Sequence, residues 1–337
     1  MMKYCFFGSS VTEQATLYKT GEVVGYVNHF ITNYLNEDSG SALRIARGNT
    51  DICNAGIIYL DDIIKWKPDI CILDWATSGN PEADIVTIYH IYKKLLAHNI
   101  LPFTVIFPRK KRCYLSLPVY KKQVEICQYF GTPLLEIDPE TELDNILRDT
   151  VHTNVLGGKI YAEKVYAGIK KILPIQPINI EENHPFTDHF ISSSELFLND
   201  IPTKILNFEM EVNTQNTITI QIFAEQMVGP YTPIIDISIF DLKGNLKQQV
   251  SENMLDIWCY RERMALKALT SKISVDKNTS KIIGKVSYKT PEHSIFSKEI
   301  LEGLSKKEQY LKGIKRTFVI FQSIEKVTSP ITNFKIL

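Results

Sequence analysis

Two patterns of hydrophobic and polar positions divide this chain. Up to about residue 173, short runs that are apolar throughout alternate with longer segments whose apolar positions recur at helical spacing. The runs predicted as strands cover 3–7, 42–46, 69–75, 102–107 and 133–137, and the predicted helices cover 22–36, 58–66, 82–98, 116–130 and 155–172. Uniformly apolar strands are typical of a parallel sheet that is covered on both faces. Residues 1–173 are therefore predicted to form a three-layer, doubly wound α/β domain of flavodoxin-like size.

The second half has a different pattern, in which apolar and polar positions mostly alternate. Predicted strands cover 204–212, 217–226, 234–242, 271–275, 281–288 and 316–324, with one helical stretch near 297–312. We expect residues 189–337 to form an all-β domain, a sandwich of jelly-roll type. Between the halves, residues 174–188 carry three prolines and no period, which predicts a linker.

Composition and charge narrow the class of protein. The chain has 337 residues, 44% of them hydrophobic, and its 38 basic residues balance 38 acidic ones. This neutrality argues against a partner such as nucleic acid or a membrane surface. There is no apolar run of the roughly 20 residues that span a bilayer, and the apolar start is too short for a secretory signal. The six cysteines include no CxxC pair, so we expect reduced packing residues in a cytoplasmic protein.

The segment after the first strand, Gly8-Ser9-Ser10-Val11-Thr12, is the first candidate for chemistry. A serine on a tight turn between a strand and a helix exposes its hydroxyl beside backbone N–H groups, as a nucleophile with an oxyanion donor requires. The alternative is that Ser9, Ser10 and Thr12 cap the following helix.

Asp149 and His152 form the second candidate. They lie three residues apart on a loop before the amphipathic helix predicted at 155–172. At this spacing a carboxylate can orient an imidazole while the ring reaches a nucleophile on a neighbouring strand end. A histidine with only a structural hydrogen bond is the alternative.

Other residues offer weaker candidates. Asp74 ends the third strand, and we consider Asp74 and Ser9 as substrate-binding residues, with a structural hydrogen bond as the alternative for Asp74. The basic run 108–112 suits either an anionic substrate or a solvated loop. His184 and His189 lack companions at ligand spacing, so no metal site is expected. Tyr231, Trp258 and Tyr260 suit either sugar stacking or a β-sandwich core.

Several of these segments together resemble the SGNH/GDSL hydrolases. GSSVT is similar to the family's GDSxT block, Asn54-Ala55-Gly56 to its second block, and DTVHTNVLGGKIYAEKV to its last block, D-x-x-H before a helix. DICILDWATSGN stands where the third block, G-x-N-D, belongs. The resemblance covers residues 1–173 and leaves the β domain unaddressed.

The resemblance implies a role for each matching residue. Ser10 would be the nucleophile, His152 the general base and then acid, and Asp149 its orienting group. The oxyanion hole would comprise the N–H groups of Ser10 and Gly56 and the side chain of Asn80. Two positions depart from the family. Ser9 replaces the aspartate before the nucleophile, and an ungapped reading puts Ser78 at the third-block position, so that Asn80 would serve only if the loop is longer. Loss of one oxyanion donor typically lowers the rate 10²- to 10³-fold.

These observations favour an esterase or O-acetyltransferase that acts on an acylated carbohydrate or small molecule, as in polysaccharide biosynthesis. It would need no cofactor, although a transferase would use acetyl-CoA or another acyl donor. The alternative is a catalytically degenerate SGNH-like binding or scaffolding protein in glycan metabolism, which the irregular third block motivates. The sequence does not decide whether the protein forms a homo-oligomer or what the β domain does.

Overall fold

The computed structural model describes most of the chain in two units. The units are Met1–Phe186 and Thr187–Leu337. The described residues are 2–17, 20–36, 40–78, 83–110, 114–138, 140–175, 178, 190–202, 207–228, 234–253, 263–287, 312–323 and 331–336.

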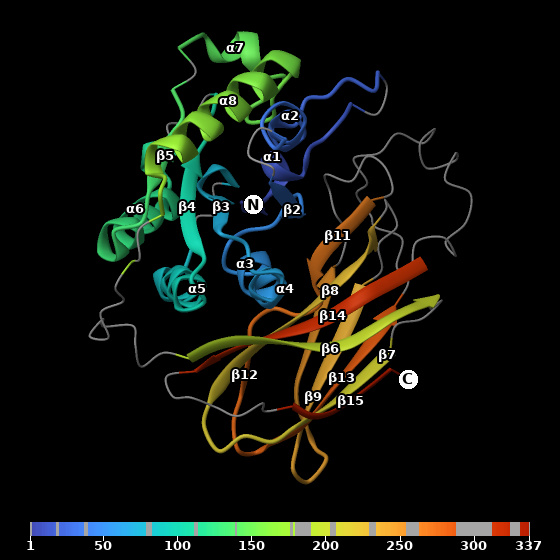
Figure 1. Cartoon of the computed structure of the whole chain (residues 1–337). Helices are drawn as coiled ribbons and strands as arrows, with labels where there is room; N and C mark the ends of the chain where they lie inside the picture. The colour runs from blue at the N-terminus through green and yellow to red at the C-terminus, as the bar shows by residue number, and fades with distance from the viewer. Residues whose placement is uncertain are drawn as a thin grey trace. The chain divides into compact units, whose positions relative to one another are not determined.

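A parallel five-stranded sheet forms the centre of the first unit (Figure 1). Its strands are β1 (Lys3–Gly8), β2 (Ser41–Ala46), β3 (Ile70–Asp74), β4 (Leu101–Ile106) and β5 (Leu134–Glu136). They pair in the order β2-β1-β3-β4-β5, and every pair is parallel. This is the flavodoxin-like doubly wound order, with its switch point between β1 and β3. The α/β fold predicted from the sequence is confirmed.

Helices cover both faces of this sheet (Figure 1). The first layer contains α2 (Tyr26–Asn33) packed on α8 (Val155–Ile172), and the second contains α3 (Ala55–Ile58), α4 (Leu60–Trp66), α5 (Ile85–Ala97) and α6 (Pro118–Phe130). The longer helices begin and end close to the predicted positions. The patterns did not predict α1 (Ser10–Glu13), α3, α7 (Leu143–Ile146) or the 3₁₀ turns η1 (Ala76–Ser78) and η2 (Tyr114–Ser116), because three or four residues are too few to show a period.

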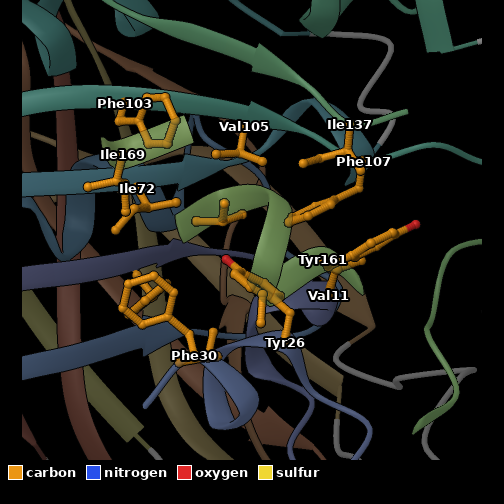
Figure 2. Packing of buried hydrophobic residues seen from close by; sticks show 14 of the residues in the cluster. Val11, Tyr26, Phe30, Ile72, Phe103, Val105, Phe107, Ile137, Tyr161 and Ile169 are labelled. Carbon is orange, nitrogen blue, oxygen red and sulfur yellow. The ribbon is translucent and has the colours of Figure 1, made fainter. Parts of the chain in front are cut away.

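An aromatic-rich core joins the sheet to the α2 and α8 layer (Figure 2). Phe107, which follows β4, stacks on Tyr161 of α8 with 4.5 Å between ring centroids. Tyr26 of α2 contacts the same phenylalanine ring at 4.9 Å. Such ring pairs add about 0.5–1.5 kcal/mol each beyond the burial of their area. These contacts pack α2 and α8 against the residue that follows the carboxyl end of β4.

Close backbone contact at Gly158 lets α8 approach the segment before α2. A Cβ on Gly158 would lie 2.4 Å from the carbonyl oxygen of Val24 and 2.9 Å from Cδ2 of His29. The carbonyl belongs to the backbone, so it cannot move aside as the end of a flexible side chain can. Glycine at this position is therefore required by the packing of the two segments.

Two antiparallel sheets form the second unit. The first has the order β10-β9-β13-β7-β15, and the second has the order β11-β8-β14-β6, with β12 also paired to β8. The strands are β6 (Phe190–Pro202), β7 (Asn207–Val212), β8 (Ile218–Val228), β9 (Ile234–Asp241), β10 (Leu246–Asn253), β11 (Arg263–Ala268), β12 (Ile273–Val275), β13 (Thr279–Ser287), β14 (Lys312–Ser323) and β15 (Ile331–Ile336). Alternate residues from both sheets share one buried cluster. The predicted all-β sandwich is confirmed.

Parts of the predicted organisation are not described by the structure. The helical stretch predicted at 297–312 lies outside the described residues except for Lys312, which begins β14. Most of the predicted linker, 174–188, is also outside them, and its limits stay a prediction. Ile175 and Ile178, which are described, pack against the core of the first unit. Within the described part of the chain, no helix is long and apolar enough to cross a membrane.

The substitution Gly158→Ala tests the close contact between α8 and Val24. Alanine favours a helix over glycine by up to about 1 kcal/mol, but overpacking a tight contact typically costs about 1–3 kcal/mol. We therefore expect a net loss of stability and a melting temperature lower by several degrees, measured by thermal denaturation. Lys159→Ala, at the next, exposed position of α8, is the matched control and should melt like the wild type. A Gly158→Ala protein that melts at a higher temperature would contradict the close approach.

Candidate active site

Ser10 lies just beyond the carboxyl end of β1, at the switch point of the sheet. β1 ends at Gly8, Ser9 precedes α1, and Ser10 is the first residue of this one-turn helix. Doubly wound sheets bind ligands beyond the carboxyl ends of the strands at this point. The serine is half-buried, and among the described residues its backbone N–H has no hydrogen-bond acceptor. The turn after β1 thus places the hydroxyl group and the backbone N–H of Ser10 at the carboxyl end of the sheet.

The side chains beside Ser10 do not cap α1. Ser9 is buried, and its side chain makes no capping hydrogen bond. Thr12 turns its hydroxyl toward β3, where it donates to Asp74 Oδ2 over 2.9 Å. The capping alternative left open by the sequence therefore does not explain these residues.

Asp74 holds the turn that carries Ser10. It is fully buried at the carboxyl end of β3, opposite Gly8 of β1 in the strand register. Its carboxyl group accepts hydrogen bonds from Thr12 Oγ1 and from Thr77 Oγ1, the latter over 2.8 Å, and Tyr26 Oη lies 3.0 Å from Thr12 Oγ1. Burial raises the pKa of Asp74 to about 7, although the hydrogen bonds from Thr77 and Thr12 oppose this shift. The geometry favours the structural alternative for Asp74 over direct contact with substrate.

Asp149 and His152 come together as a hydrogen-bonded pair. His152 Nδ1 lies 3.0 Å from Oδ1 and 2.9 Å from Oδ2 of Asp149. Oδ1 also accepts from the backbone N–H groups of Val151 and His152, over 3.0 and 2.9 Å. Partial burial raises the pKa of Asp149, but these hydrogen bonds outweigh it and hold the pKa well below its usual range. Asp149 thus remains a carboxylate over the working range of pH.

The loop with this pair is attached to the segment that follows α1. Thr153 is fully buried, and its Oγ1 donates to the carbonyl oxygen of Val24 over 2.6 Å. Gln14 is the residue after α1, and its Nε2 donates to Thr153 Oγ1 over 2.5 Å. One side chain therefore connects the helix that begins with Ser10 to the residue next to His152.

Ser10 and His152 are not hydrogen-bonded to each other in the described structure. Catalytic hydrogen bonds are often long in ligand-free enzymes and shorten when substrate binds. The imidazole is 26% exposed, which leaves part of the ring accessible to a ligand. The structure thus pairs Asp149 with His152 directly, whereas the helix that begins with Ser10 is connected to their loop through Gln14 and Thr153.

The predicted oxyanion donors have different surroundings. Gly56 is the second residue of α3 and is buried; a Cβ there would lie 2.9 Å from Ile91 Cδ1. Among the described residues its N–H, like that of Ser10, has no acceptor. Ser78 ends the 3₁₀ turn η1, whereas Asn80 lies outside the described residues.

The sequence patterns did not single out Gly48, a further backbone donor at this end of the sheet. Gly48 comes two residues after β2, just as Ser10 comes two residues after β1, and Gly8 pairs with Ala46 in the register of these strands. Its N–H donates to Glu13 Oε2 of α1 over 2.7 Å. The signal available in the sequence was a glycine two residues after the predicted strand 42–46.

The basic run 108–112 makes internal contacts where it is described. Arg109 donates through Nη1 to the carbonyl oxygen of Thr77. Lys110 donates through Nζ to the carbonyl oxygen of Leu147 over 2.7 Å. Neither the solvated-loop nor the anion-binding alternative accounts for these contacts. Lys111, Arg112 and the remaining candidates of the sequence lie outside the described residues; these are His184, His189, Tyr231, Trp258 and Tyr260.

Four of the six cysteines lie in the described part of the chain. Cys5, Cys71 and Cys127 are buried thiols that form no disulfide, and Cys53 is a half-buried thiol that forms none. No group of three or more His, Cys, Asp or Glu side chains within the described ranges is arranged to hold a metal ion.

Comparison with solved structures gives one match over nearly the whole chain and others over about half of it. A two-domain esterase (CEX) active on acetylated mannans, co-crystallised with mannopentaose, has a TM-score of 0.60 over 97% of this chain and 92% of its own, at 14% identity. An acetyl xylan esterase, AlAXEase, matches 50% of this chain and 100% of its own with a TM-score of 0.43 at 17% identity. The acetylxylan esterase Axe2 from Geobacillus stearothermophilus matches 53% of this chain and 97% of its own, with a TM-score of 0.40 at 14% identity.

The first of these comparisons bears on the fold of the whole chain. An α/β unit followed by a β unit is the arrangement that this chain shares with the two-domain esterase.

No family model matches the sequence, and no curated protein matches it.

Asp74 should make the stability of the protein depend on pH. Because its pKa in the folded state is about 7 and the ordinary value is 3.8, the folded state keeps a proton between these values that the unfolded state has lost. Stability from this group therefore falls as the pH rises from about 4 to 7, by up to about 1.4 kcal/mol per pH unit. Asp74→Asn should remove this fall, which urea unfolding at pH 5, 6, 7 and 8, followed by tryptophan fluorescence, can measure.

A matched control for this prediction is Asp61→Asn. Asp61 is an exposed carboxylate of the same unit, with a side chain that is 63% exposed. The Asp61 variant should keep the wild-type pH dependence. An Asp74→Asn protein with the same slope as the wild type would show that another group is responsible.

Proposed function

We propose that this chain is a serine esterase that removes a short acyl group, such as acetyl, from a carbohydrate. The observation that carries the proposal is the Asp149–His152 pair, which Gln14 and Thr153 link to the helix beginning at Ser10. The shared fold with an esterase active on acetylated mannans makes acetylated manno-oligosaccharides the first substrates to test.

The proposed chemistry starts from the charge of Asp149. Its carboxylate accepts the Nδ1–H of His152, so that Nε2 carries the free lone pair of a general base. Nε2 takes the proton from Ser10 Oγ while Oγ attacks the ester carbonyl carbon. The resulting imidazolium then gives this proton to the leaving sugar oxygen as the C–O bond breaks, leaving an acyl-serine. A water molecule, deprotonated by the same imidazole, hydrolyses the acyl-serine and regenerates the hydroxyl.

Backbone N–H groups would stabilise the negative oxygen of the tetrahedral intermediate. Ser10 N–H is without an acceptor among the described residues and belongs to the nucleophile's own turn. Gly56 N–H is the second donor in this proposal, and Asn80 is the third. Asn80 lies outside the described residues, and its role in this proposal rests on the resemblance of the segment after β3 to the third family block.

Transfer of the acyl group to a sugar is an alternative reaction that uses the same catalytic residues. If a sugar hydroxyl replaces water in the second step, the enzyme is an O-acyltransferase, with acetyl-CoA or another activated ester as donor. The triad is identical in both cases, so product analysis with donor and acceptor glycans separates them.

Substitution of the triad tests the proposal. Ser10→Ala should abolish labelling by a fluorophosphonate and reduce acetate release from p-nitrophenyl acetate to the background rate, because the nucleophile is lost. His152→Ala should lower kcat by at least about 10³-fold. Both rates are measured spectrophotometrically, and the products from acetylated manno-oligosaccharides are measured by mass spectrometry.

The control for these variants is His98→Ala. His98 is an exposed histidine at the end of α5, and its Nδ1 lies 2.8 Å from the carbonyl oxygen of Lys94. This variant should keep wild-type activity. The proposal fails if the wild-type protein is not labelled and shows no turnover that depends on Ser10, either with simple esters or with acetyl-CoA plus glycan acceptors. A binding or scaffolding protein would then be the better account.

A second test concerns the oxyanion side chain. Asn80→Ala should lower kcat about 10²- to 10³-fold with little change in KM, because the lost hydrogen bond acts in the transition state. Ser78→Ala should change kcat by less than about threefold. The opposite result would assign the donor to Ser78.

A further inference from the structure

Lys110 contacts the loop of the Asp149–His152 pair at three points. It follows β4 by four residues, at the carboxyl end of the sheet. Its backbone N–H donates to the carbonyl oxygen of Thr150 over 2.9 Å. Its Nζ donates to the carbonyl oxygen of Leu147 over 2.7 Å and lies 2.8 Å from Asp144 Oδ1.

Two of these contacts fall on a small hairpin, one on its first arm and one on its turn. Leu147 and Thr153 pair as an isolated antiparallel bridge, and the N–H of Arg148 donates to the carbonyl oxygen of His152 over 2.9 Å. The turn between these residues contains Asp149. Lys110 therefore holds the first arm at Leu147 and the turn at Thr150, while Thr153 on the second arm is held by Val24 and Gln14.

The burial of Lys110 distinguishes this role from those suggested by the basic run. Its side chain is 19% exposed, so it is not a solvated loop residue. Two hydrogen-bonding directions of the ammonium group are already occupied by a carbonyl oxygen and a carboxylate, which leaves little to offer an anionic substrate. Charge-assisted hydrogen bonds of a mostly covered lysine are stronger than those of an exposed one.

We infer that Lys110 is a positioning residue, which holds the Asp149–His152 loop at the carboxyl end of β4 so that the imidazole faces Ser10. This role rests on the proposed function, since it matters for catalysis only if His152 is the base. Reacting groups displaced by about 1 Å can lose on the order of 10²-fold in rate. The expected defect is in kcat, because Lys110 acts through His152 and does not touch the substrate.

Kinetics of three variants test the inference. Lys110→Met removes the ammonium group and keeps a long side chain; we expect kcat for p-nitrophenyl acetate to fall about 10- to 100-fold, with KM within about threefold of the wild type. Lys110→Arg restores a cationic donor and should recover most of the rate. Asp144→Asn removes only the partner, whose side chain is 86% exposed, and should lower kcat by less than about threefold.

Lys94→Met is the matched control. Lys94 also pairs with an aspartate, Asp61, over 2.7 Å, but on α5 and α4, away from the loop. Its kinetic constants should equal those of the wild type. Equal kcat in the Lys110→Met and wild-type proteins, or an equal loss in the Lys94→Met protein, would overturn the inference.

Hydrogen exchange supplies a readout that does not depend on activity. Amides in peptides covering 143–153 should exchange faster in the Lys110→Met protein, measured by mass spectrometry, while those of β1 and α5 keep the wild-type rate. If the wild type has no Ser10-dependent turnover, the proposed function fails, and this exchange experiment still decides whether Lys110 holds the loop. Faster exchange throughout the Lys110→Met protein would indicate general destabilisation. In that case Lys110→Gln, which keeps a hydrogen-bond donor for Leu147, should restore protection at 143–153. Failure of Lys110→Gln to restore it would refute the role of Lys110 in holding the loop.

Discussion

The pairing of β1 with both of its neighbours is the constraint on which the candidate site depends. Gly8, the last residue of β1, is opposite Ala46 of β2 on one side and Asp74 of β3 on the other. The chain must leave the sheet here through a turn so close to β3 that a Cβ on Gly8 would lie 2.4 Å from Thr12 Oγ1 and 2.9 Å from the carbonyl oxygen of Asp74. The buried carboxyl of Asp74 then needs hydrogen-bond donors, and Thr12 of the same turn supplies one of them. The position of Ser10 follows from this contact.

Two carboxyl groups near this end of the sheet illustrate how surroundings decide the role of a residue. Asp74 is fully buried, so its pKa is raised even though threonine hydroxyls donate to it. Asp149 is partly exposed and receives two backbone N–H groups and an imidazole, so its pKa is lowered. The first carboxyl group suits a structural hydrogen-bond network, and the second suits a permanent negative charge beside a histidine. Both are aspartates in the sequence, and only their neighbours distinguish them.

Errors in the predicted strands follow the positions of those strands in the two β sheets. The patterns predicted β7, β8, β9, β12, β13 and β14 but not β6, β10, β11 and β15, and these four stand at the ends of the two strand orders. The short strand β12, which pairs only with β8, is an edge strand that the patterns did predict. An edge strand is exposed along one side and often carries polar or charged residues that prevent further pairing. The sequence of β10, LKQQVSEN, is an example, because it shows hardly any apolar alternation. Central strands are buried against neighbours, and their alternation is therefore visible in the sequence.

The sequence by itself determined the α/β architecture, the β sandwich and the closeness of Asp149 to His152. Each of these depends on local patterns: apolar period, strand length, and a spacing of three residues within one loop. Only the tertiary structure decided how Asp74 is used, that Gly48 donates to Glu13, and that Lys110 and Gln14 hold the loop of His152 from either side. Gln14 and Thr153 are 139 positions apart in the chain, and Lys110 is 37 positions from Leu147. Contacts at such separation arise from the order of the strands in the sheet, and no local pattern of residues encodes them.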